Sequence, residues 1–301
     1  MPPPPPPPPP FEPLRTSGLS RGARTSIAIA VIVVIVLVGI IAYAVAGFAY
    51  SSSKLRSADK SLNTVISHQN SLNSTFNDID TKFSTLNNGS TFDPVQAKAL
   101  MAQFVANAQA AGVTVGSDDA SLVTASTSLD EEPWLTVFNR GTLDKEKGRI
   151  DHARNALSDA KQVTDGYVKD GQFLVAFIDA AADLDTLGTQ TANADLAGAK
   201  TTLGTLTTHV DTALQLSAAP GLPPELHNLM VDFETLVSDF GKLLDAAAAN
   251  NDAAIASSEK AAKADANKLS TYNFDTIGAK INAFYKPLLD GFNSEMAKAT
   301  A

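Results

Sequence analysis

The sequence predicts an all-α protein: an N-terminal transmembrane helix followed by an elongated antiparallel helical bundle with a coiled-coil-like first helix. Three observations predict this fold class. A single apolar block, Ile27 to Tyr50, is long enough to cross a bilayer. Beyond it, apolar residues recur at three- and four-residue steps, and no segment shows the alternation that is typical of a strand. Short turns between long helices predict antiparallel neighbours.

The chain of 301 residues divides into three predicted regions. Residues 1–24 are a proline-rich tail that we expect to be disordered, residues 25–50 are the transmembrane helix, and residues 51–301 are an acidic helical-bundle domain. The net charge is −9, and the first fifty residues contain three arginines and one glutamate, so the domain beyond them is more acidic than the whole chain. Such a charge repels nucleic acid, and no nucleic-acid partner is expected.

The tail contains an unbroken run of prolines from Pro2 to Pro10. This run predicts a polyproline II segment roughly 28 Å long, at about 3.1 Å per residue. Segments of this kind act either as stiff spacers or as ligands for aromatic-lined grooves. The flanking residues define no known recognition class, which favours the spacer.

The apolar block Ile27 to Tyr50 contains no charged residue. As a helix it would be roughly 36 Å long, which spans a hydrocarbon core of about 30 Å with some tilt. We therefore expect the lipid bilayer to be contacted through this block, as a permanent signal anchor. Cleavage after Ala46, as in a signal peptide, is one alternative. A pilin-like leader is another, because Arg21-Gly22-Ala23 before an apolar helix resembles the class III signal peptides of archaeal pilins.

Positive charges flank the predicted membrane helix almost equally on both sides. The arginines and lysines nearest to it are Arg15, Arg21 and Arg24 before it and Lys54, Arg56 and Lys60 after it. Anchors this close to the N-terminus usually leave a short tail in the cytoplasm. We therefore expect a single-pass protein of the cell membrane whose large C-terminal domain is extracytoplasmic.

The segment from Leu62 to Leu86 predicts a coiled-coil-like helix directly after the anchor. Its apolar positions alternate at three- and four-residue steps, with polar Gln69 at the one missing position: Leu62, Val65, Leu72, Phe76, Ile79, Phe83 and Leu86. A seam of this kind buries itself against a partner helix, in the same chain or in another copy. We expect it to mediate self-association or the binding of a protein partner.

Further helices are predicted along the rest of the chain. We expect a short helix from Pro94 to about Gly112, a helix start at Ser128 through a capping box, and a long helix from Ile150 to Leu184 that two Asp-Gly pairs could break. The remaining expected helices are Leu196–Leu214, Pro224–Leu244, an alanine-rich one after Asn250-Asn251 to about Leu269, and Ile277–Met296 with a kink at Pro287.

The sequence carries no motif that indicates catalysis. It has no cysteine, which excludes disulfides and thiolate chemistry, and it lacks phosphate-binding, dinucleotide-binding and nucleophile-elbow motifs. The acidic clusters Asp118-Asp119 and Asp130-Glu131-Glu132 are expected at helix N-termini, where the helix dipole stabilises carboxylates.

The four histidines are far apart in the sequence, and we interpret them as solvated or partly packed: His68, His152, His209 and His227. We therefore predict no catalytic, cofactor-binding or metal-ligating residues and no cofactor, and an enzyme is the least expected class.

These observations together favour a membrane-anchored helical protein of a prokaryotic cell envelope with a structural or protein-interaction role. If the domain is outside, the cytoplasmic tail is too short to hold an output domain. The alternative is a small-ligand-binding or sensory module, with a pocket lined by Leu226–Leu244 and Phe173–Ile178. A pilin-like filament subunit is the third possibility.

Overall fold

The computed structural model describes residues 60–65, 67–68, 94–130 and 140–301. These residues are mainly helical and contain no strand, so the all-α fold class is confirmed. Six long helices contain most of them: α3 (Pro94–Asp130), α4 (Arg140–Ala192), α5 (Leu196–Leu216), α6 (Pro224–Ala248), α7 (Asp252–Leu269) and α8 (Phe274–Thr300).

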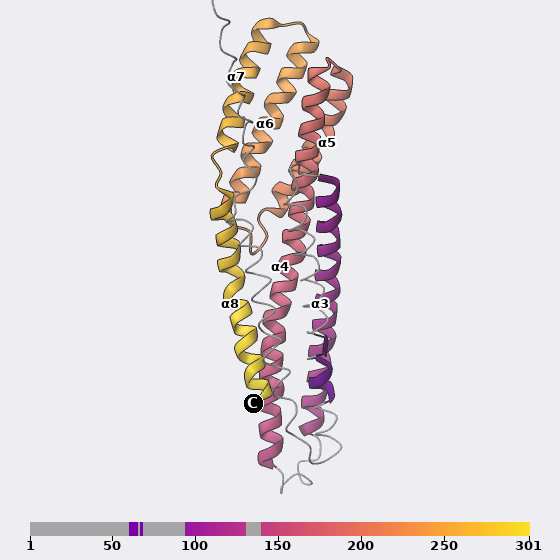
Figure 1. Cartoon of the computed structure of the whole chain (residues 1–301), viewed down its shortest axis with the longest axis vertical. Coiled ribbons are helices and arrows are strands. Elements are labelled where there is room, and N and C mark those ends of the chain that lie inside the picture. Colours follow the sequence, from indigo (N-terminus) through magenta and orange to yellow (C-terminus); the bar gives the residue numbers. More distant parts are fainter. Residues whose placement is uncertain (1–59, 66, 69–93, 131–139) are drawn as a thin grey trace, which may run out of the picture.

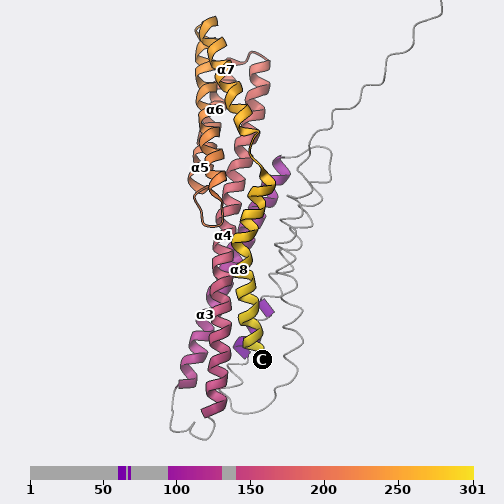
Figure 2. The ribbon, with the colours of Figure 1, turned by 90° about the vertical axis from the view of Figure 1, so that its left-hand side faces the viewer.

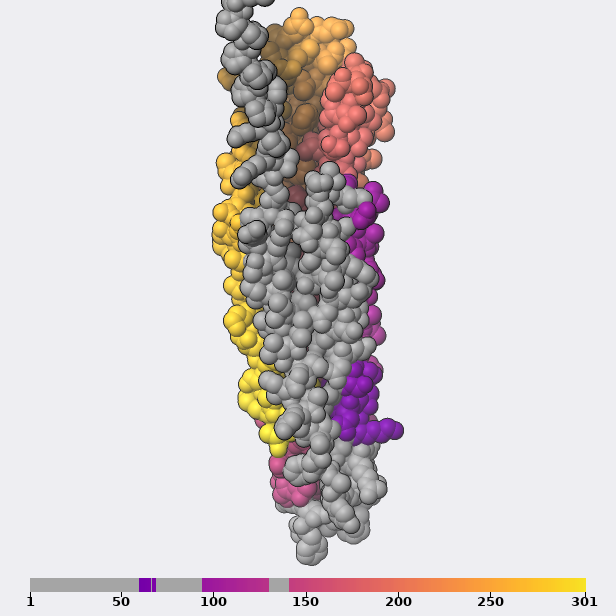
Figure 3. Space-filling model, viewed as in Figure 1, coloured from indigo at the N-terminus to yellow at the C-terminus, as the bar shows by residue number. Residues whose placement is uncertain are grey.

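The described helices form an elongated body of two bundles stacked end to end (Figures 1 and 3). α4 runs through both bundles, and its 53 residues correspond to a helix about 80 Å long. The lower bundle contains α3, the first half of α4 and the second half of α8. The upper bundle contains the second half of α4 with α5, α6 and α7, and α8 continues from α7 along the same side of the body (Figure 2).

Each bundle has its own apolar core. The lower core joins α3, α4 and α8, and Leu62 and Val65 from residues 60–65 also belong to it. Its other members are Val115, Leu122, Ala125, Leu129, Leu143, Ile150, Ala153, Ala156, Leu157, Phe292, Met296 and Ala299. The upper core is built mainly from α4, α5 and α6, and Phe173, Leu206, Met230 and Phe233 are among its larger members. A third, small cluster of Val163, Tyr285 and Leu289 lies between the two cores.

The buried face of α4 changes register where the two bundles meet. In the lower bundle, buried positions recur every seven residues at Leu143, Ile150 and Leu157, and Thr164 continues the series. A second series in the lower bundle, Glu146 and Ala153, would reach Leu174 and Ala181 at the same spacing, but both are exposed. The upper bundle instead buries residues one position earlier: Phe173, Ala180 and Leu187. A slip of one residue turns the buried face of a helix by about 100°. One continuous helix thereby faces two differently oriented sets of partners.

α8 shows the same change of register at the same level. Ile281 and Leu288, seven residues apart, are partly buried beside the upper core and the small central cluster. Leu289 and Met296, each one position later, are buried against the central cluster and the lower core. Both helices that connect the bundles therefore rotate their apolar faces at one place.

Polar side chains cap three of the helix starts. Asp195, Asn251 and Asn273 each accept a hydrogen bond from the backbone amide three residues later, at 2.9–3.1 Å, and so begin α5, α7 and α8. α3 and α6 begin with prolines, Pro94 and Pro224, whose missing amide hydrogen is not needed at that position. The starts predicted at Pro94, Leu196 and Pro224 are confirmed.

α3 is longer than the sequence analysis predicted, since it continues past Gly112 to Asp130. Half of its buried apolar positions are alanines, and the large ones beyond Gly112 are spaced seven residues apart: Ala97, Met101, Ala108, Ala111, Val115, Leu122, Ala125 and Leu129. The expected N-terminal position of Asp118-Asp119 is therefore wrong, because both lie inside α3. Ser128 is also inside α3, where its hydroxyl donates to the Ala125 carbonyl instead of capping a new helix.

α4 does not break at its two Asp-Gly pairs. It is continuous from Arg140 to Ala192 and includes Gly166 and Gly171. Glycine costs a helix interior about 1 kcal/mol relative to alanine. The neighbouring bundle packing offsets this cost, because side chains from other helices lie directly against both glycines.

Among the described residues, no helix is both long and apolar enough to cross a membrane. The predicted membrane segment at 25–50 and the tail at 1–24 lie outside the described residues, as do positions 69–86 of the predicted seam. The first two seam positions, Leu62 and Val65, are buried in the lower core. These two side chains pack within the chain itself.

α7 is held to α6 mainly by polar contacts, since Ala262 is its only fully buried residue. Lys268 donates to Asp232 of α6 at 2.7 Å, and the Tyr272 hydroxyl donates to the other oxygen of the same carboxylate, also at 2.7 Å. Asp232 is itself buried. One carboxylate of α6 therefore fixes the end of α7 and the turn that leads into α8.

We expect Asp232→Ala to lower the free energy of unfolding by about 1–2 kcal/mol, because two donors lose their shared acceptor. Asp245→Ala is the matched control: Asp245 also accepts from a lysine, Lys200 at 2.8 Å, but its side chain is 76% exposed. The control should change the free energy of unfolding by less than about 0.5 kcal/mol. Urea unfolding of the full chain, followed by circular dichroism, measures both; equal effects would contradict this account of α7.

Candidate functional site at the junction of the two bundles

A buried tyrosine–aspartate pair lies at the junction of the two bundles. Tyr285 of α8 is 1% exposed, and its hydroxyl donates to Oδ2 of Asp170 in α4 at 2.7 Å. Asp170 is only 7% exposed, which is unusual for a carboxyl group without a cationic partner. The pair connects the two helices that run through both bundles.

Two glycines make room for Tyr285. A Cβ atom on Gly166 of α4 would lie 2.8 Å from Cε1 of Tyr285, and one on Gly221 would lie 2.9 Å from its Cζ. Gly221 belongs to the connection between α5 and α6 and has φ of 100°, in the left-handed region that favours glycine. Tyr285 therefore packs against the α5–α6 connection as well as against α4.

Aromatic rings extend this contact to α3. Ring centroids of Phe104 in α3 and Tyr167 in α4 are 5.5 Å apart, and those of Tyr167 and Tyr285 are 4.8 Å apart. These separations lie in the favourable range for tilted aromatic pairs. Gly171 of α4 allows this approach, because a Cβ atom there would lie 3.1 Å from the Phe104 ring. All three helices of the lower bundle are thus joined at one level.

Burial raises the pKa of Asp170 to about 7, although the hydrogen bond from Tyr285 acts in the opposite direction. The second oxygen, Oδ1, is buried and has no hydrogen-bond partner. Burial also raises the pKa of Tyr285, and the charge of Asp170 raises it further. The carboxyl group consequently changes its protonation state near neutral pH, at a position that water does not reach freely.

Three of the four histidines contact a carboxylate through Nδ1, each joining two different segments of the chain. The pairs are His68–Asp118 at 2.9 Å, His152–Glu295 at 2.7 Å and His209–Asp183 at 2.8 Å. The histidine side chains are between 36% and 44% exposed. Each contact is a hydrogen bond between an imidazole nitrogen and a carboxylate oxygen, and it ties two segments of the chain together.

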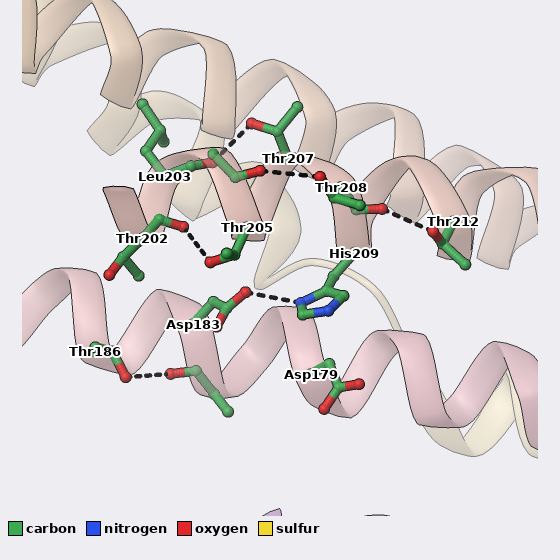
Figure 4. Close-up of polar contacts among 12 residues, drawn as sticks. Asp179, Asp183, Thr186, Thr202, Leu203, Thr205, Thr207, Thr208, His209 and Thr212 are labelled. Carbon is green, nitrogen blue, oxygen red and sulfur yellow. Dashed lines mark hydrogen bonds and ion pairs between the residues drawn. The ribbon is translucent and has the colours of Figure 1, made fainter. Parts of the chain in front are cut away.

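The surroundings of His209 show why its pair is not a nucleophile–base arrangement (Figure 4). Threonine hydroxyls near it donate to the backbone carbonyls one turn earlier: Thr207 to Leu203, Thr208 to Gly204 and Thr212 to Thr208, at 2.8–3.1 Å. A nucleophilic hydroxyl would instead donate to the imidazole. The contact from His209 to Asp183 of α4 holds α5 against α4.

His227 and Ser217 form the one histidine–serine contact among the described residues, at 2.9 Å. The Ser217 hydroxyl also contacts the Leu214 carbonyl at 2.6 Å and must donate its hydrogen there. Ser217 is 2% exposed and is the C-terminal cap of α5. This serine is therefore a structural cap, not an accessible nucleophile.

Within the described ranges, no group of three or more histidine, aspartate or glutamate side chains could hold a metal ion. The structure separates the acidic cluster that the sequence analysis considered: Asp118 contacts His68, whereas Asp119 contacts Arg154 at 2.8 Å. Glu131 and Glu132 lie outside the described residues. The Asp170–Tyr285 pair was not predicted, and its only signal in the sequence is the pair of Asp-Gly steps in α4.

Comparisons of the chain with protein-family models, with curated proteins and with solved structures gave no match. A buried carboxyl group with one hydrogen-bonded oxygen couples a protonation equilibrium to helix packing.

The close packing of Gly166 against the Tyr285 ring predicts opposite effects on stability for two glycine substitutions in α4. Gly166→Ala should lower the free energy of unfolding by about 1–3 kcal/mol, because the new methyl group overlaps the Tyr285 ring. Gly188→Ala is the matched control, since nothing lies within 4 Å of a Cβ atom there. It should raise the free energy of unfolding by roughly 0.5–1 kcal/mol. If both substitutions changed the free energy of unfolding in the same direction, Gly166 would not be needed to make room for the Tyr285 ring.

The raised pKa of Asp170 predicts a pH-dependent effect for Asp170→Asn. Because the folded-state pKa lies above the ordinary 3.8, the folded protein binds the extra proton, and wild-type stability decreases as the pH rises towards 7. Asparagine has nearly the same shape and does not titrate. The stability advantage of the variant should therefore be about 2 kcal/mol larger at about pH 8 than at about pH 5.5. Urea unfolding at the two pH values measures it, and a pH-independent difference would contradict the prediction.

Proposed function

We propose that this protein is a membrane-tethered helical rod of a prokaryotic cell envelope, with a structural or protein-interaction role. The observation that carries the proposal is α4, whose 53 continuous residues form one wall of both cores. A shared helix prevents the two bundles from separating as independent domains. An elongated body about 80 Å long is better suited to act as a spacer or as a docking surface than to act as a compact catalytic domain.

The predicted membrane anchor would fix how the two bundles are positioned relative to the bilayer. The block Ile27 to Tyr50 lies in the sequence just before residues 60–65, which pack into the lower core. A tether this short would keep the lower bundle close to the bilayer. The upper bundle, with the α6–α7 turn at its tip, would then extend away from it (Figure 1). Partners would meet the rod along its length or at this tip.

A ligand-binding or sensory module remains the second candidate. The two segments that the sequence analysis expected to line a pocket do meet: Phe173 and the apolar face of α6 belong to the same upper core. Phe173 and Phe177 stack with their ring centroids 6.0 Å apart. These side chains pack against each other, so a ligand would have to displace packed groups. This arrangement favours the structural role.

We expect labelling of intact cells by a membrane-impermeant maleimide to place the rod outside the cytoplasm. The chain has no cysteine, so single cysteines at Ser20 and at Lys260, an exposed residue of α7, give no background. Lys260→Cys should be labelled and Ser20→Cys should not, while permeabilised cells should label both. The reverse pattern would place the acidic rod in the cytosol and overturn the envelope role.

Crosslinking of the same full-length protein in intact cells tests the interaction role separately. A partner or a second copy should be recovered with the chain under mild crosslinking. A monodisperse monomer with no co-purifying protein would count against the role even if the topology is as proposed.

A further inference from the structure

Residues that weaken a helix coincide at the junction in all three helices that pass it. α3 has Gly112 there, at the level of Thr164 of α4, to whose Oγ1 a Cβ atom on Gly112 would lie 3.4 Å. α4 has Gly166 and Gly171, and α8 has Pro287, which cannot donate to the carbonyl four residues earlier.

The apolar core is also divided at this level. The lower and upper cores are separate clusters, and the buried residues of the small cluster between them are Val163, Tyr285 and Leu289. α4 and α8 both change register here, so neither bundle continues its seam through the junction. The Asp170–Tyr285 hydrogen bond is the buried polar contact that joins the two helices at this point.

We propose that the Asp170–Tyr285 pair is a protonation-controlled joint, which holds the two bundles in one rigid rod when Asp170 is protonated and loosens the junction when Asp170 is ionised. The proposal goes beyond the tethering role and does not depend on which partner the rod contacts. It adds a conformational response to pH to a body that is otherwise continuous.

The physical reason is the unsatisfied oxygen of Asp170. A neutral carboxyl group can be buried with one oxygen bonded to Tyr285 at moderate cost. An ionised carboxylate needs donors at both oxygens, and Oδ1 has none. Water can supply them only if the helices separate around Asp170. A buried carboxylate is usually stabilised by a lysine or arginine, and no such partner contacts Asp170 among the described residues.

The other charged and titratable groups on the helices around Asp170 are paired elsewhere or exposed, so they do not compensate its charge. On α4, Tyr167 is the nearest titratable group one turn away, Lys161 is paired with exposed Asp165 at 2.7 Å, and Lys169 is exposed. On α8, Lys286 is paired with Asp290 and Lys280 with Glu225. On α3, Lys98 is paired with Asp179 at 2.7 Å, Asp118 with His68 and Asp119 with Arg154. The α5–α6 connection contains no charged residue.

Hydrogen–deuterium exchange of the full chain tests the joint. Backbone amides of residues 163–171 and 283–291 should exchange about tenfold faster at about pH 8 than at about pH 6, after correction for the chemical effect of pH. This factor follows from one pH unit between pH 6 and the raised pKa of about 7, above which the opening equilibrium no longer changes. Amides of α6 should show no such ratio and serve as an internal reference.

Two substitutions separate the joint from general loosening. Asp170→Asn should abolish the tenfold ratio and keep exchange slow at both pH values. Asp165→Asn is the matched control, because it removes a carboxylate from the same helix that is exposed and paired with Lys161. It should keep the ratio. Tyr285→Phe should shift the transition to a higher pH, because it removes the one interaction that lowers the Asp170 pKa.

A distance measurement tests whether the whole body responds. Spin labels on single cysteines at Thr124 of α3 and Thr201 of α5, both exposed, report on the lower and upper bundles. Their distance distribution should be narrow at about pH 6 and broader at about pH 8. The proposal is overturned if the exchange ratio is absent in the wild type, if it persists in Asp170→Asn, or if the distance distribution is the same at both pH values.

Discussion

α4 must supply one wall to two cores, and the rest of the structure depends on this constraint. A straight helix with an unbroken heptad seam would present both cores on a single face. α4 instead moves its buried face by one residue, because Ala153 of the lower core is followed by Phe173 and Ala180 of the upper core, one position earlier than a heptad repeat would place them. α8 makes the same shift between Leu288 and Leu289. The two bundles can therefore share two helices and still surround separate cores.

This shift of register leaves an unfavourable polar group at the junction of the two bundles. Between two seams that are out of register, Tyr285 fills the space with one large side chain and packs against Tyr167. Its ring needs Gly166 and Gly221 on either side and an acceptor for its hydroxyl. Asp170 supplies that acceptor, but it brings a second oxygen that nothing satisfies. The raised pKa of this carboxyl is therefore a consequence of joining the bundles.

The sequence predicted the all-α class and the later helices well, because Leu, Phe and Val recur at helical steps and Asn251 and Pro224 mark helix starts. It failed in the second half of α3, where Val115, Leu122 and Leu129 are spaced seven residues apart among small and polar residues. The junction could not be predicted at all. Gly166 suggested a helix break, and only a ring from residue 285, far along the chain, explains why the helix continues.

A rigid body and a joint are compatible in one molecule because they rest on different interactions. The two cores are apolar, and their packing does not change with pH in the neutral range. The junction depends instead on one buried carboxyl group, and protonation of Asp170 removes a buried charge between α4 and α8. Both cores therefore stay intact while the contact between the bundles responds to pH.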